Sequence, residues 1–148
     1  MSLDVYLNLP GHITHGGNKI FIREKGAMQE ISREEWNARH PEYDPVFCAA
    51  EYSDEVYTAN ITHNMGDMAG AVDLYRWLWH PDKSGVVTAK QLIEPLRNGL
   101  FRLIEERKSL LHLNPDNGWG NYNLLVEFTR KYLIACEDWP DATVSVSR

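Results

Sequence analysis

The stretch EVYTANITHNMGDM, residues 55–68, decides the fold, because its pattern changes from strand to helix within a few residues. Apolar and polar side chains alternate over residues 55–61, which is typical of a half-buried strand. From Met65 to Trp79 the apolar residues recur instead at helical spacing. Thr62 or Asn64 can cap the start of that helix. The sequence therefore predicts a strand that runs directly into a helix.

Upstream of this stretch the sequence predicts short strands and one short helix. A capping box at residues 32–35 predicts a helix that ends before Pro41. Residues 41–54 carry two prolines and several acids and are expected to be mostly irregular. The strands are expected at residues 3–7, 19–23 and 27–31.

Downstream, two further helices and a last strand are expected. Thr88 is a candidate N-cap for a helix whose apolar stripe runs to Ile104, with Pro95 and Gly99 weakening its interior. A third helix begins after Gly120, and residues 142–148 alternate like a strand.

The segregation of strands and helices favours an α+β fold over α/β. A small antiparallel sheet would combine the N-terminal strands, the strand near 55–61 and a C-terminal strand, and it would pack against three main helices. The 148 residues are expected to form a single domain, 1–148, with a partly irregular excursion at 10–54.

Composition narrows the classes of function. The net charge of −6 argues against wide contact with nucleic-acid backbone, but it permits a small ligand in a local pocket or a basic protein partner. No apolar run is long enough for a membrane helix, and no signal peptide is visible, so we expect a cytoplasmic protein. Cys48 and Cys136 lie in apolar settings and are expected to be buried free thiols.

Two short motifs carry the functional hypotheses, NITHN at residues 60–64 and NGWG at residues 117–120, and each is placed at a helix start. The simpler interpretation is that both are helix caps, with Trp119 covering the core and Asn121 capping the third helix. The alternative keeps this geometry and adds a ligand, because a helix N-terminus attracts anions and an aromatic ring offers a stacking face. The candidate ligand-binding residues are Asn60, Thr62, His63, Asn64, Asn117, Trp119 and Tyr122.

Metal binding and catalysis have weaker support. His12 and His15 stand three apart in a Gly-rich loop, where His63 or Asp4 could complete a site, but zinc sites usually show better-defined spacing and solvated loop histidines are the simpler interpretation. No hydrolase, P-loop or dinucleotide motif is present. A general base at His63 with Asp67 is the remaining catalytic hypothesis. No catalytic residue, metal or cofactor is therefore predicted.

Several segments resemble a family of small uncharacterised proteins from phages, prophages and bacteria. They are ANITHNMGDMA at residues 59–69, LWHP at 78–81, NGWGNY at 117–122 and PDATVSVSR at 140–148, together with the opening MSLDVYL. Residues 10–54 are similar to a region in which members differ in length. The resemblance implies a phage-type accessory protein that antagonises host defence, either by sequestering a nucleotide signal or by covering a defence protein.

Three functions follow as expectations. The leading one is a non-enzymatic protein that sequesters a small nucleotide-like ligand at the two motifs, in the host cytoplasm. The second is an inhibitor of a host defence protein that acts through its acidic surface and the 10–54 excursion. The third is a small hydrolase centred on His63. Nucleic-acid and membrane partners are not expected, and a homo-oligomer is left open. Trp77, if exposed, would mark a partner surface.

Overall fold

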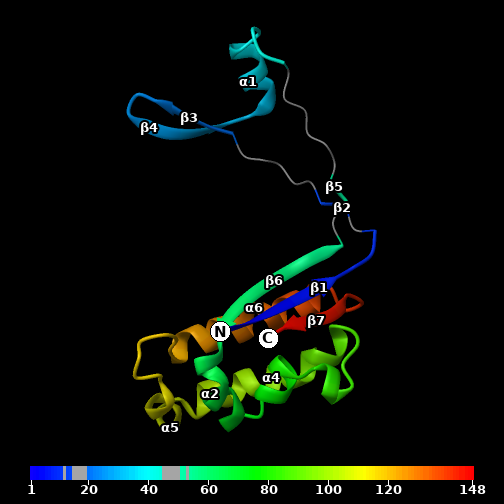
Figure 1. Cartoon of the computed structure of the whole chain (residues 1–148), viewed down its shortest axis with the longest axis vertical. Helices are drawn as coiled ribbons and strands as arrows, with labels where there is room; N and C mark the ends of the chain where they lie inside the picture. Colours follow the sequence, from blue (N-terminus) through cyan, green and yellow to red (C-terminus); the bar gives the residue numbers. More distant parts are fainter. Residues whose placement is uncertain (12, 15–19, 45–50, 53) are drawn as a thin grey trace. The chain divides into compact units, whose positions relative to one another are not determined.

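The computed structural model describes residues 1–11, 13–14, 20–44, 51–52 and 54–148, which belong to two compact units. The first unit comprises Met1–His12 and Asp54–Arg148, and the second comprises Ile13–Ser53. The second unit is thus an insertion in the first and corresponds closely to the excursion expected at 10–54 (Figure 1). His12, His15 and Cys48 lie outside the described residues.

The first unit is built on a three-stranded antiparallel sheet in the order β6-β1-β7. The central strand β1 (Ser2–Asn8) pairs with β6 (Glu55–Thr62) on one side and with β7 (Thr143–Ser147) on the other. In the register, Leu3 faces Ile61 and Val5 faces Val146. Alternate residues of β1 are fully buried, which confirms the predicted periodicity of this strand. The pairing of β1 with β7 confirms the predicted terminal strand beside it.

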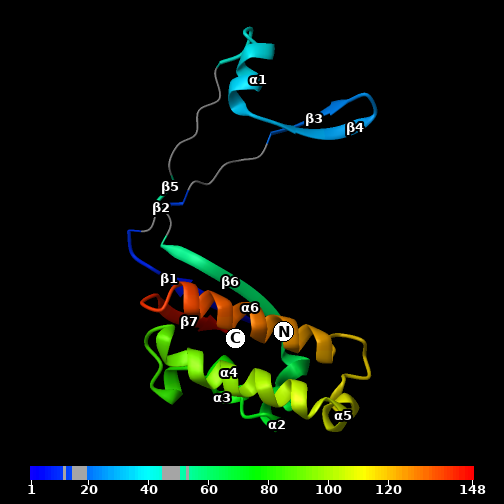
Figure 2. The same ribbon diagram turned by 180° about the vertical axis from the view of Figure 1, so that it is seen from behind.

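Helices cover the inner face of this sheet. The two long ones, α4 (Lys90–Glu105) and α6 (Tyr122–Asp138), pack against each other, and α6 also contacts β6. Figure 2 shows α6 lying along the sheet with α4 beside it. The shorter helices are η1 (His63–Met65), α2 (Gly66–Ala71), α3 (Tyr75–Trp79), η2 (Asp82–Ser84), α5 (Arg107–Leu110) and η3 (Leu111–Leu113). The α+β class predicted from the sequence is confirmed.

The continuous helix predicted over Met65–Trp79 is wrong. Helix α2 ends at Ala71, Asp73 takes a φ of +58°, and the chain becomes helical again at Tyr75, where α3 begins. Packing explains the break, because the fully buried Leu74 lies directly on Gly99 of α4. A Cβ at Gly99 would come within 2.2 Å of Leu74 Cδ2. The glycine that was expected to weaken α4 is therefore required for this close approach.

The N-cap predicted at Thr88 is also wrong. The side chain of Gln91 reaches back, and its Oε1 accepts the backbone N–H of Val87 at 2.7 Å and of Thr88 at 2.9 Å. Thr88 instead forms a β-bridge with Thr143, the first residue of β7. Gln91, the second residue of α4, thus fixes the two backbone N–H groups that precede the helix.

Within its described residues, the second unit holds two short strand pairs and one helix. β3 (Ile20–Glu24) and β4 (Ala27–Ile31) form a hairpin, while β2 (Ile13–Thr14) pairs with β5 (Glu51–Tyr52). Helix α1 (Arg33–Arg39) begins at Ser32, whose Oγ accepts the N–H of Glu35 at 3.1 Å, as the capping box predicted. Among the side chains described here only Ile31 is buried.

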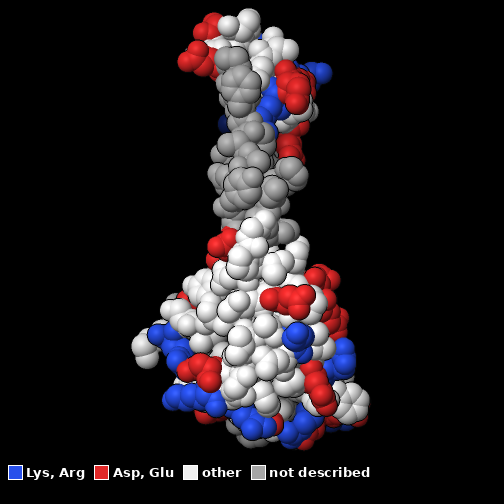
Figure 3. All heavy atoms as spheres, turned by 90° about the vertical axis from the view of Figure 1, so that its right-hand side faces the viewer, with Lys and Arg blue, Asp and Glu red and all other residues white. Residues whose placement is uncertain are grey.

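Two general surface properties bear on function. In the described part of the chain, no helix has both the length and the apolar character to cross a bilayer. On the face of the first unit seen in Figure 3, Lys and Arg are interspersed with Asp and Glu around an uncharged area.

Cys136 is buried and free, as predicted, and burial raises the pKa of its thiol to about 12.

Candidate functional site

The two motifs meet in the folded chain. Asn64, which follows the end of β6, donates from Nδ2 to Oδ1 of Asn117 at 3.4 Å and to the carbonyl oxygen of Trp119 at 3.2 Å. Asn117 Oδ1 also accepts the backbone N–H of Trp119 at 2.9 Å. One amide side chain from each motif therefore holds the loop before α6 against the turn after β6. We call these linked segments, residues 60–64 and 117–120, the motif junction.

Gly120 allows the two segments to approach this closely. Its φ of +102° is unfavourable for residues with a side chain. A Cβ there would lie 2.7 Å from Sδ of Met65 and 2.8 Å from Cγ2 of Thr62. The glycine of the second motif is thus needed both for its backbone conformation and for contact with the first motif.

The predicted caps are present and use the backbone donors at both helix starts. Thr62 Oγ1 accepts the N–H of Asn64 at 3.3 Å, and Asn121 Oδ1 accepts the N–H of Leu124 at 3.0 Å. The helix that follows the first motif, η1, has only three residues and so contributes little dipole. The free N–H groups on which anion binding was predicted are therefore largely occupied by the protein's own side chains.

Tyr122 does not join this surface, although it was a candidate ligand-binding residue. Its side chain is only 6% exposed, and its hydroxyl donates to the carbonyl oxygen of Leu103 at 2.7 Å. Its backbone N–H donates to Asn114 Oδ1 at 2.7 Å. The structure assigns Tyr122 to the packing of α6 against α4.

His63 is partly buried and hydrogen-bonded to Trp79, whose Nε1–H donates to Nδ1 at 2.9 Å. Because an indole nitrogen can only donate, Nδ1 carries the lone pair and Nε2 carries the proton. Nε2 is buried and has no hydrogen-bond partner in the described part of the chain. In this tautomer neither nitrogen can accept a proton from a substrate, so the geometry does not support a general base at His63.

Trp119 is the exposed feature of the motif junction. Its side chain is 72% exposed, contrary to the expectation that it covers the core. It lines two adjoining cavities, one of about 500 Å³ on the side of Asn64 and Asn117 and one of about 260 Å³ on the side of Leu124. Asn60 and Thr62 line both cavities as well. The ring therefore stands between two hollows. The larger is lined mostly by polar side chains of the two motifs, whereas the smaller is lined by Ile61, Gly120 and Leu124 as well as Asn60 and Thr62.

Several amide atoms of the motif junction remain available. Nδ2 of Asn60 donates to Asp4 Oδ1 at 2.6 Å, and Nδ2 of Asn64 is used within the junction. The Oδ1 atoms of Asn60 and Asn64 form no hydrogen bond with any described residue. The same holds for Nδ2 of Asn117. No Lys or Arg among the described residues lines either cavity. The site thus offers two acceptors, one donor and an aromatic ring, without a positive side chain.

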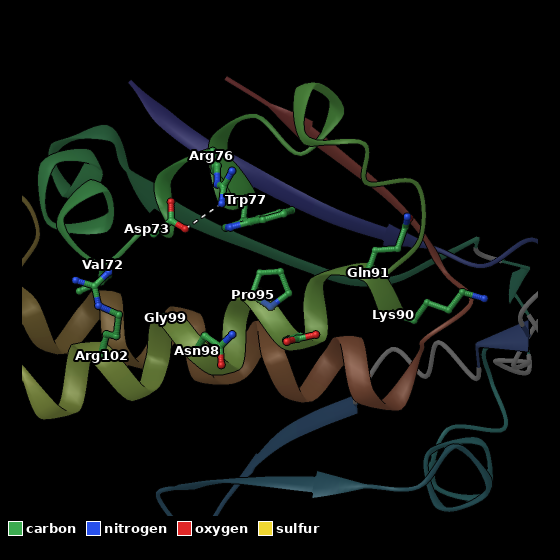
Figure 4. Close-up of a pocket in the computed structure, with 11 residues that line it drawn as sticks. Val72, Asp73, Arg76, Trp77, Lys90, Gln91, Pro95, Asn98, Gly99 and Arg102 are labelled. Carbon is green, nitrogen blue, oxygen red and sulfur yellow. Dashed lines mark hydrogen bonds and ion pairs between the residues drawn. The ribbon is translucent and has the colours of Figure 1, made fainter.

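A separate cleft, of about 540 Å³, lies between α3 and α4 in the first unit, away from the two cavities of the motif junction (Figure 4). The sequence predictions did not include it, although Trp77, which they considered as a partner surface, lines it and is half-buried. The signal that could have found it is a row of polar residues spaced by four along α4. The row consists of Lys90, Glu94, Asn98 and Arg102.

No group of three or more His, Cys, Asp or Glu side chains that could hold a metal ion occurs within the part of the chain that the structure describes. Comparisons with protein-family models, with curated proteins and with solved structures give no match to this chain. The candidate function therefore rests on the geometry of the described residues.

Proposed function

We propose that this chain is a non-enzymatic binding protein that holds a nucleotide-like ligand at the motif junction, through the base of the ligand. The observation that carries the proposal is the exposure of Trp119 beside two cavities, the larger of which is lined by asparagines of both motifs. An exposed ring is a stacking platform, and base–aromatic stacking contributes about 1–3 kcal/mol per base.

The free amide atoms favour a base over other flat ligands. Nucleobases are recognised by stacking on an aromatic ring combined with hydrogen bonds to their polar edges. Oδ1 of Asn60, Oδ1 of Asn64 and Nδ2 of Asn117 can supply such bonds, since no described residue uses them. The motif junction therefore offers an aromatic face to the ring of a base, and two acceptors and a donor to its polar edge.

The side chains that line the motif junction favour recognition of base and sugar rather than phosphate. Phosphate groups are normally held by Arg, Lys or free backbone N–H groups. The described residues that line the cavities include no Lys or Arg, and caps occupy most of the local N–H groups. We therefore propose that a nucleoside binds about as well as the corresponding nucleotide.

A binding role without turnover agrees with the geometry of His63, which leaves no accessible proton acceptor in this site. The resemblance to phage-type accessory proteins suggests the purpose. Such a protein would act on host defence in the host cytoplasm by sequestering a nucleotide signal. Inhibition of a host defence protein stays the alternative.

Titration calorimetry of the full chain tests the proposal, with the four common nucleosides, their monophosphates and cyclic dinucleotides as probes. We expect binding of at least one base, with similar affinity for nucleoside and nucleotide. Trp119→Ala should weaken that binding by roughly tenfold or more, the loss of one stacked base. Phe101→Ala is the matched control, because Phe101 is an aromatic residue 64% exposed on α4 and lines neither cavity.

Two results would overturn the proposal. One is the absence of heat with every probe in a sample whose cooperative thermal unfolding shows that it is folded. The other is equal affinity of the wild-type chain and Trp119→Ala for a ligand that does bind.

A further inference from the structure

The cleft between α3 and α4 has a polar floor formed by α4. Residues spaced by four lie on one side of a helix, so the row Lys90, Glu94, Asn98 and Arg102 runs along the cleft. A neighbouring row consists of Gln91, Pro95 and Gly99. Figure 4 shows Trp77 extending from α3 over this floor, with Asp73 and Arg76 beside it.

The positive side chains of the cleft are already paired. Arg76 lies over the ring of Trp77, with its Cζ 4.6 Å from the ring centroid, and Arg102 also donates to the carbonyl oxygen of Ala71 at 3.0 Å. The ion pairs are Arg76 with Asp73 at 3.1 Å, Arg102 with Glu106 at 2.8 Å and Lys90 with Asp141 at 3.7 Å.

Glu94 has no such partner. No hydrogen bond or ion pair joins its carboxylate to any residue that the structure describes. The cleft therefore presents one uncompensated negative charge, although its lining includes three cations. An incoming cation would meet this charge without breaking an existing pair.

Pro95 adds a hydrogen-bond acceptor to the same floor. Proline has no N–H, so the carbonyl oxygen of Gln91 loses the donor that would normally bond to it four residues later in the helix. The side-chain amide of Asn98 also forms no hydrogen bond with a described residue. Two acceptors and one carboxylate thus lie within two turns of α4.

Trp77 supplies a wall that suits the stem of a long basic side chain. Lys and Arg bury their methylene groups along apolar surfaces while the charged group reaches polar partners. The position of Arg76 over Trp77 shows that this ring accepts a guanidinium group. Trp77 and Pro95 line the cleft together with Glu94.

We propose that this cleft is a docking site for a Lys or Arg side chain of a basic polypeptide partner. Charge complementarity points to that occupant, since Glu94 is the unpaired charge of the cleft and the whole chain carries a net charge of −6. The stem packs on Trp77 and Pro95, and the charged group donates to Glu94 and to the carbonyl oxygen of Gln91. This site is separate from the motif junction and does not depend on the function proposed there.

The probe is the capped peptide acetyl-Gly-Arg-Gly-amide, added to the full ¹⁵N-labelled chain and followed by nuclear magnetic resonance. We expect the indole N–H signal of Trp77 and the side-chain amide signals of Asn98 to shift saturably. The same peptide with citrulline in place of arginine should shift them much less, because citrulline is neutral. Glu94→Gln should weaken binding by roughly three- to fivefold, as for an exposed ion pair.

Glu105→Gln is the matched control, because it makes the same charge change on α4 outside the cleft. Equal affinities of Glu94→Gln and Glu105→Gln for the peptide would overturn the proposal, as would the absence of any shift at Trp77. Spermidine is the second probe. If it binds the same residues as tightly as the arginine peptide, the site serves small polyamines and the polypeptide partner is ruled out.

Discussion

Replacing Gly120 with alanine tests whether the two motifs are held together as the structure shows. A side chain at a φ of +102° costs about 1–2 kcal/mol through the backbone alone. The new Cβ would also lie 2.7 Å from Met65 Sδ and 2.8 Å from Thr62 Cγ2. Met65 is fully buried, and Thr62 belongs to a paired strand, so neither can move away freely.

Overpacking of this kind typically costs about 1–3 kcal/mol. The two effects together predict a loss of about 2–5 kcal/mol in the free energy of unfolding for Gly120→Ala. For a chain of this length that loss lowers the Tm by about 5–15 °C. Differential scanning calorimetry and urea titration of the same samples give the two values independently.

Gly118→Ala is the control for the backbone effect. Gly118 also has a positive φ, of +75°, but a Cβ there would meet no atom within 4 Å. We expect it to lose only about 1–2 kcal/mol. If the two variants unfold at the same temperature and urea concentration, Gly120 does not lie against Thr62 and Met65, and the junction of the two motifs is not as described.

The remaining predictions concern buried side chains that can donate or accept a hydrogen bond or proton. Trp79→Phe removes the donor to His63 Nδ1 and should lower the free energy of unfolding by about 1–3 kcal/mol in urea titration, because a buried acceptor loses its partner. Tyr132→Phe should leave the free energy of unfolding unchanged or raise it, since the buried Tyr132 hydroxyl has no hydrogen-bond partner among the described residues; a clear loss in the same assay would contradict this. In a Cys48→Ser background, Cys136 should resist iodoacetamide at pH 8 until urea unfolds the chain, because burial raises the pKa of its thiol from 9.0 to about 12. Because the folded state favours the protonated thiol, the thiol contributes to stability fully below pH 9.0, and this contribution is lost as the pH rises towards about 12. Measuring the Tm as a function of alkaline pH tests this.

The sheet could be predicted because its strands alternate visibly in the sequence. Leu3, Val5 and Leu7 are buried in turn, and this two-residue period needs no knowledge of the rest of the fold. The break at Asp73 could not be predicted in this way. It depends on Leu74 packing on Gly99, a contact between residues 25 positions apart in sequence, and local periodicity carries no information about such contacts.

The residue types of the two motifs could be read from the sequence, but the geometry of their junction could not. The spacing of residues places Asn64 and Asn117 at helix starts, and it contains nothing about the hydrogen bond between them. Residue spacing also cannot show whether caps occupy the backbone N–H groups at the helix starts, or whether an aromatic residue such as Trp119 faces solvent. Tyr122 illustrates the limit, because a residue three positions from Trp119 is buried in the core.

The place of β1 in the sheet has a consequence for the order of folding. This first strand of the chain is the central one, and its partners lie at residues 55–62 and 143–147. Pairing over such separations closes long loops, which slows folding relative to proteins with local contacts. During synthesis β1 must wait for β6, and then for β7, to leave the ribosome. Until then its buried residues Leu3, Val5 and Leu7 stay exposed on an unpaired strand, where chaperones can bind.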